Sequence, residues 1–348
     1  MHTDSTPFNV TYGTGSVSGS LATDTIHIGT LSSSLTFGLA TNVSAEFQSY
    51  AMDGILGLGR GTTQSDSQPS VMDVLSTSNL ISSKLYGIHL SRSKDGKLDG
   101  ELNLGAVNKD RFTGDLNWSD VVDNDAGFWE IPLSSATVDG NLVSLTTDGA
   151  RTAIIDTGTS YILLPPADAL ALHSGIPQFE QSSDKQTFSV PCDTGSTIAF
   201  SFGKEVYNIS SADWIGAKLD SGLCRSNIIG LQTFGATQWL VGDVFLKNVY
   251  SAFDFDNKKV GFGVLSDDDA EEADATASSS SGSSSAKVSQ TGTASSGSAD
   301  PTSSADAASG AQQPEGQKGA GGAAGKATAS LLGFAVMIAL LSSFVFTF

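Results

Sequence analysis

The stretch Ala153-Ile154-Ile155-Asp156-Thr157-Gly158-Thr159-Ser160 decides the fold, because in it an apolar strand delivers an aspartate into a glycine-containing turn. Amide hydrolysis by two carboxylates uses such turns. Two Asp side chains held a few ångströms apart cannot both ionise, so they share one proton. Asp156 is therefore the candidate catalytic carboxylate. Asp-Thr-Gly alone usually marks a simple turn, so the assignment depends on the segments around it.

The residues that follow Asp156 have expected supporting roles. Gly158 lets the backbone approach a partner loop closely, and the hydroxyls of Thr157 and Thr159 are expected to brace the loop and the carboxylate. A second Asp-Thr-Gly begins at Asp193, directly after a cysteine. We interpret that second motif as a hairpin turn without a catalytic role.

The chain up to about residue 265 has the pattern of a mostly-β protein. Apolar and polar residues alternate in short runs, which is typical of half-buried strands; examples are Phe8–Tyr12, Thr25–Ile28, Thr197–Phe202 and Val249–Phe255. Only two short surface helices are expected, at Val71–Leu75 and Ala167–Leu172.

Composition excludes some classes of partner. The chain has 37 acidic and 18 basic residues and a formal charge of -19, which would repel nucleic-acid phosphates. The four histidines lie at 2, 27, 89 and 173, without the spacing of metal ligands. We therefore expect no nucleic-acid partner, no metal site and no cofactor.

Several further segments together resemble the pepsin family of aspartic proteases. Phe8–Gly19 looks like that family's flap, a hairpin that folds over the substrate. Asp53–Gly59 and Trp239–Leu246 resemble the glycine loops behind the first and second catalytic aspartates. Phe128–Leu133 and Ser251–Phe262 resemble the segments that open and close the second lobe. The motifs occur in the family order over residues 7–264.

The resemblance implies a mostly-β, bilobal pepsin-like fold with the first strands of the N-terminal lobe missing. It makes Tyr12, Gly13 and Thr14 the flap residues that meet substrate, and it places Ile55 near an apolar pocket. It implies an aspartic endopeptidase that activates water with two aspartates, acting on proteins or peptides as a monomer.

The two cysteines, Cys192 and Cys224, could form a disulfide or remain buried thiols by their spacing alone. They stand where the pepsin-like family has a disulfide in its C-terminal lobe. The resemblance therefore favours the disulfide.

The family's first catalytic aspartate has no counterpart in this sequence. It is expected well before Tyr12, which only eleven residues precede, and Asp4 follows no apolar strand. We expect the first aspartate upstream of Met1, so that the chain as written is truncated, incomplete and inactive. The alternative is a catalytically inactive pepsin-fold surface protein that binds peptide or wall polymer.

The C-terminal part predicts attachment to the cell surface. Residues 266–330 are rich in Ser, Ala and Gly and are expected to form a disordered stalk. Residues 331–348 are apolar and follow small residues and a polar spacer, as in a glycosylphosphatidylinositol (GPI) attachment signal. We expect attachment at Gly319, as in fungal yapsin-like members of the family, with a membrane helix as the alternative.

Domain boundaries follow from these assignments. We expect a partial N-terminal lobe with the flap at 1–118, a C-terminal lobe with the Asp-Thr-Gly site at 119–265, and then the stalk and the anchor signal. Four Asn-x-Ser/Thr sequons, at Asn9, Asn42, Asn117 and Asn208, weakly support secretion.

Overall fold

The computed structural model describes residues 1–13, 15–48, 52–61, 68–92, 95–145, 148–266 and 343–346. The chain divides into two compact units, residues 1–282 with 335–348, and residues 283–334. The second unit lies wholly outside the described residues, as do Thr14, Gly319 and the apolar residues 331–342. No helix of the described residues is both long and apolar enough to cross a bilayer.

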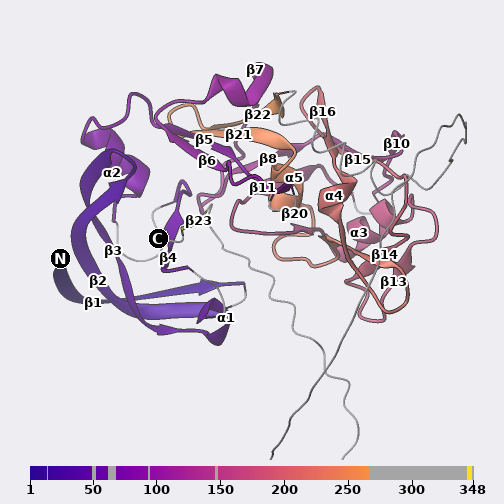
Figure 1. The fold of residues 1–348 in the computed structure, drawn as a ribbon, viewed down its shortest axis with the longest axis horizontal. Coiled ribbons are helices and arrows are strands. Elements are labelled where there is room, and N and C mark those ends of the chain that lie inside the picture. The colour runs from indigo at the N-terminus through magenta and orange to yellow at the C-terminus, as the bar shows by residue number, and fades with distance from the viewer. Residues whose placement is uncertain are drawn as a thin grey trace, which may run out of the picture. The chain divides into compact units, whose positions relative to one another are not determined.

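An antiparallel sheet of three long strands opens the chain (Figure 1). Its order is β1 (His2–Tyr12), β2 (Gly15–Ile28) and β3 (Leu31–Val43). Along the second half of β1 exposed and half-buried residues alternate, as expected for one wet and one covered face. The short helix α1 (Ala45–Gln48) follows β3.

A five-stranded sheet combines strands from both halves of the sequence. Its order is β6 (Glu101–Leu104), β5 (Leu85–His89), β21 (Val249–Asp254), β22 (Lys259–Leu265) and β7 (Phe112–Asp120). Asp254 pairs with Leu85, so the chain's last core strands lie against much earlier ones. The expected lobe boundary at 118 falls inside β7, which pairs with β22.

A second five-stranded sheet carries the Asp156 turn. Its order is β19 (Ile228–Ile229), β12 (Ile162–Leu163), β20 (Gln238–Val241), β11 (Arg151–Ile155) and β8 (Glu130–Leu133). β11 runs parallel to β20 and antiparallel to β8. The residues of β11 and β20 are almost all buried, which suits a strand pair covered on both faces.

Smaller sheets complete the described part. One has the order β10 (Asn141–Leu142), β9 (Ser135–Val138), β15 (Ile198–Phe202) and β16 (Glu205–Ile209). Another has the order β13 (Glu180–Gln181), β14 (Phe188–Val190), β18 (Cys224–Ser226) and β17 (Ile215–Lys218). β23 (Ser343–Phe346) pairs with β4 (Gly54–Gly57).

The helices are short. They are α2 (Val71–Thr77), α3 (Pro166–His173), α4 (Ser211–Trp214), α5 (Asp243–Leu246) and a 3-10 turn, η2 (Lys109–Arg111). Both helices expected from the sequence are confirmed as α2 and α3. Ser70 begins α2 with a reciprocal capping box to Asp73, which satisfies amide groups that the first turn leaves free.

Two sets of side-chain hydrogen bonds hold the core around the sheet that carries the Asp156 turn. The Trp129 indole and the Tyr86 hydroxyl both donate to the Leu58 carbonyl at 3.0 Å, and so fix the glycine loop of residues 53–59. At the start of β11, Arg151 donates to both carboxylate oxygens of Asp168, at 2.7 and 2.9 Å. All four of these side chains are buried.

The mostly-β pepsin-like architecture predicted from the sequence is confirmed. The strands expected at 8–12, 25–28, 197–202 and 249–255 lie in β1, β2, β15 and β21.

Candidate active site

Asp156 lies directly after β11, where the parallel pair β11–β20 ends. Its backbone amide donates to the Val241 carbonyl at 3.1 Å, and the amide of the preceding Ile155 donates to the Trp129 carbonyl at 2.9 Å. Backbone bonds on two sides therefore fix the aspartate at the edge of the sheet.

Two donors hold the Asp156 carboxylate. The Gly158 amide donates to Oδ1 at 2.9 Å, and the Thr159 hydroxyl donates to Oδ2 at 2.6 Å. Hydrogen bonds to a charged carboxylate are short and strong. The carboxylate is thus fixed in one orientation, and only 3% of the residue is exposed.

Burial raises the pKa of Asp156 from its ordinary value of 3.8 to about 7, and the negative charge of nearby Asp243 acts in the same direction. The hydrogen bonds from Thr159 and Gly158 oppose this rise because they favour the ionised form. The effect of desolvation is larger than that of the two hydrogen bonds, so Asp156 carries a proton in acid solution.

Asp243 is a site residue that sequence reasoning did not single out. It is the first residue of α5, and its amide donates to the Thr159 carbonyl at 2.8 Å. Its Oδ1 is buried and has no hydrogen-bond partner among the described residues. Burial raises the pKa of Asp243 to about 7, against the attraction of Lys247. The only signal in the sequence was an acid inside the glycine loop of residues 239–246.

Gly242 shows why that loop needs a glycine. A Cβ at this position would lie 1.9 Å from the Thr159 carbonyl oxygen, so any side chain would push the two segments apart. This contact keeps Asp243 next to the Asp156 turn.

The two threonines of the motif differ in the structure. Thr159 bonds the carboxylate as described above. The Thr157 hydroxyl is buried and makes no hydrogen bond to any described residue. The bracing role expected for both hydroxyls is therefore seen only for Thr159.

The flap residues lie at the tip of the β1–β2 hairpin, where Tyr12 pairs with Gly15 across a turn that contains Gly13. The Tyr12 ring meets Phe47 edge to face, with ring centroids 5.3 Å apart, and burial raises the pKa of the Tyr12 hydroxyl. Thr14 lies outside the described residues.

Ile55 is a half-buried residue of β4. Among the interactions of the described residues, no hydrogen bond or ring contact joins Ile55 or Tyr12 to Asp156. Their substrate-binding roles stay predictions.

Cys192 and Cys224 form a disulfide, with a Cα–Cα distance of 4.9 Å. It joins the end of β14 to β18. The turn that begins at Asp193 follows this bond, and Asp193 is exposed.

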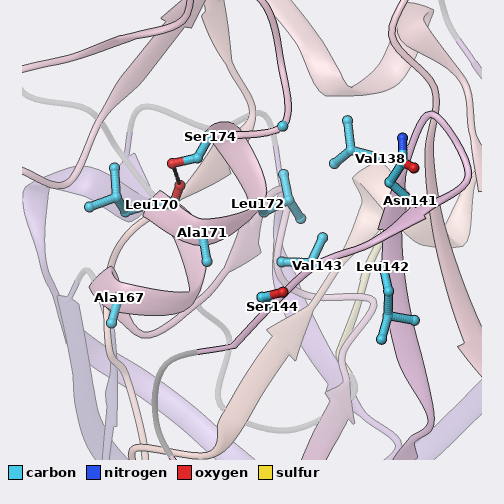
Figure 2. Close-up of a pocket in the computed structure, with 11 residues that line it drawn as sticks. Val138, Asn141, Leu142, Val143, Ser144, Ala167, Leu170, Ala171, Leu172 and Ser174 are labelled. Atoms are coloured by element: carbon cyan, nitrogen blue, oxygen red, sulfur yellow. Dashed lines mark hydrogen bonds between the residues drawn. The ribbon is translucent and has the colours of Figure 1, made fainter.

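A pocket lies apart from these residues, between the β9–β10 hairpin and α3 (Figure 2). Its volume is about 520 Å³, and apolar side chains such as Val138, Leu142 and Leu172 line much of it. None of the predicted site residues lines this pocket. No group of three or more His, Cys, Asp or Glu side chains suited to a metal ion occurs in the part of the chain that the structure describes.

Comparison with known proteins agrees with this geometry. The family model of the eukaryotic aspartyl proteases matches residues 1–265. The chain belongs to this family. This member of the family is 45% identical over 253 residues to the aspartic-type endopeptidase ctsD of Aspergillus fumigatus, covering 73% of the chain and 52% of that relative.

Two other relatives extend the comparison. A probable aspartic-type endopeptidase CTSD of Arthroderma benhamiae is 43% identical over 256 residues, covering 73% of the chain and 49% of the relative. Pepsin A of Sus scrofa is 34% identical over 263 residues, covering 74% of the chain and 66% of the relative. The chain spans about half the length of the two fungal relatives.

Proposed function

We propose that this protein is an aspartic endopeptidase that hydrolyses peptide bonds of secreted or cell-surface proteins, with Asp156 as one of two catalytic aspartates. The observation that supports this most is the Asp156 carboxylate: buried, held by Gly158 and Thr159, and protonated in acid solution.

In the proposed reaction the two carboxylates share one proton and titrate as a unit. The environment of Asp156 favours its protonated form, so Asp156 donates a proton to the oxygen of the scissile carbonyl. The ionised partner accepts a proton from the attacking water. As the C–N bond breaks, the partner passes the proton from the water to the leaving amine, and a hydroxyl of the tetrahedral intermediate returns a proton to Asp156.

The test uses the protein as its own cells make it. Asp156→Asn is introduced at the gene, and hydrolysis of unfolded protein substrates is measured in acid solution. We expect loss of at least about 10³-fold in kcat, since an amide cannot share or donate the proton.

Asp193→Asn is the matched control, because it alters the same tripeptide at an exposed turn. Equal activity of the Asp156→Asn and unaltered proteins would overturn the proposal. Peptide binding without hydrolysis by the unaltered protein would instead support a non-catalytic peptide-binding protein.

We also propose that the protein is anchored at the cell surface through a lipid attached at Gly319. The support is sequence alone: an apolar C-terminus after small residues and a spacer. Treatment of intact cells with a phosphatidylinositol-specific phospholipase should release the protein. Retention after treatment, with release only by detergent, would favour a membrane helix instead.

A further inference from the structure

The four sequons look equivalent in the sequence but not in the fold. N-linked sugar is bulky and must lie at the surface, with the Asn Nδ2 atom free to carry it. The exposure and hydrogen bonds of each asparagine therefore separate the sites that tolerate a glycan from those that do not.

We infer that Asn9, Asn42 and Asn208 carry N-linked oligosaccharide in the folded protein and that Asn117 does not. The inference does not depend on catalysis. It requires only that the chain passes through the secretory pathway.

Asn208 is the clearest acceptor. It is an exposed residue of β16, an edge strand, and its side chain has no hydrogen-bond partner among the described residues. Its neighbours Tyr207 and Ile209 are buried, so alternation along the strand turns Asn208 outward. A sugar at this position displaces no packed group.

Asn9 and Asn42 share one face of the three-stranded sheet. Asn9 pairs with Ser18, and Ser18 pairs with Asn42 on its other side. Paired residues point to the same face, so the two asparagines flank Ser18 with about 10 Å between their strands. Both are exposed, and neither side chain has a hydrogen-bond partner in the described part of the chain.

The sugars on this sheet would leave the flap tip accessible. Tyr12 is three residues from Asn9 along β1, so the two side chains point to opposite faces. A glycan on Asn9 therefore extends away from the face that carries the Tyr12–Phe47 contact.

Asn117 is different because the fold uses its amide. It is half-buried on β7, and its Nδ2 donates to the Phe202 carbonyl at 2.8 Å. The turn after β15 closes over it: a Cβ at Gly203 would lie 4.0 Å from Nδ2. A sugar on Nδ2 would have to displace this turn, so chains modified there cannot complete the packing of β7.

Glycosylation transfers an oligosaccharide from a lipid carrier to the asparagine side chain. The donor is a lipid-linked oligosaccharide pyrophosphate. Its C1–O bond to phosphate breaks, a C1–N bond forms to Asn Nδ2, the amide loses one proton, and the lipid pyrophosphate leaves. The sugar is transferred before the chain folds. Because a chain modified at Asn117 cannot complete its packing, the folded protein should carry no sugar at Asn117.

The experiment expresses the full chain in a fungal host behind a secretory leader. Folded protein is selected by resistance of the chain up to residue 265 to limited proteolysis. Peptide-N-glycosidase treatment in heavy-oxygen water then marks each glycosylated asparagine as labelled aspartate, read by peptide mass spectrometry. We expect label at Asn9, Asn42 and Asn208 and none at Asn117.

Two Asn→Gln variants test separately whether Asn208 and Asn117 carry sugar. Asn208→Gln should remove one glycan and increase gel mobility by one step, whereas Asn117→Gln should leave mobility unchanged. Unmodified Asn208, or labelled Asn117 in the protease-resistant fraction, overturns the inference. If no protein is secreted, translation with microsomes replaces expression, and absence of sugar at Asn208 there overturns it as well.

Discussion

Replacing Asp156 by asparagine should change how the stability of the protein depends on pH. The pKa of the Asp156 carboxyl is raised from 3.8 to about 7 in the folded chain, chiefly by burial. The folded state therefore holds its proton more tightly than the unfolded state. The resulting stabilisation is complete below pH about 4 and is lost as pH rises through about 7.

The size of this effect follows from the shift. Each unit of pKa corresponds to about 1.4 kcal/mol, so a rise of about three units gives about 4 kcal/mol. An asparagine does not titrate. The free energy of unfolding of the wild-type protein, minus that of Asp156→Asn, should thus fall by about 4 kcal/mol between pH 4 and pH 8.

The assay is denaturant unfolding of the full chain and of the variant at intervals across this pH range. Asp243 also titrates near pH 7, but it is present in both proteins, so its contribution largely cancels in the difference. Asp193→Asn is the control, because it makes the same chemical change in an exposed turn away from the Asp156 carboxylate.

A difference between wild type and Asp156→Asn that stays constant from pH 4 to pH 8 would refute this reasoning. So would a difference that grows with pH, because it would mean that the folded site favours the ionised carboxylate. A constant difference would show that the Thr159 and Gly158 hydrogen bonds balance desolvation, and a growing one that they outweigh it.

Three further outcomes are expected. Thr159→Val removes a charged hydrogen bond worth about 1.5–3 kcal/mol, so the pKa of Asp156 should rise by about 1–2 units, measured by carboxyl carbon NMR; an unchanged pKa contradicts this. Arg151→Met leaves Asp168 buried and unpaired and should cost about 3–5 kcal/mol in denaturant unfolding, whereas adding Asp168→Leu should restore much of the loss. Burial lowers the pKa of His173 to about 4, so wild type should lose stability relative to His173→Phe as pH falls from 6.5 to 4; equal loss in both proteins would count against it.

The local sequence pattern was enough to predict several strands and the turn at Asp156. Alternating apolar residues predicted β1, β2, β15 and β21. The half-buried character expected for them holds along the second half of β1, whereas β15 and β21 are buried on both faces. The apolar run before Asp156 predicted a buried strand leading into a turn, and β11 is that strand.

The pairing of strands that are distant in the sequence could not be predicted from the local pattern. β7 and β22 pair in one sheet, although they lie far apart in the sequence. Strand pairing depends on backbone groups that are the same for every residue, so composition carries little information about which distant strands meet.

The electrostatics of the site likewise came from the fold. Asp243 is 87 residues from Asp156 in the sequence numbering. The pairing of β11 with β20, the Gly242–Thr159 contact and the bond from the Asp243 amide to Thr159 make the two segments neighbours in the fold. From the sequence, the hydroxyls of Thr157 and Thr159 were both expected to brace the loop and the carboxylate, whereas only the Thr159 hydroxyl donates to the carboxylate.

The sequence by itself indicated the family and the Asp156 turn, because short motifs in a fixed order carry that information, and the family resemblance favoured the pairing of Cys192 with Cys224. Only the tertiary structure decided how strongly Asp156 holds its proton, and which sequons are free to carry sugar. Those properties depend on burial and on partners from distant segments, and such contacts exist only after the chain has folded.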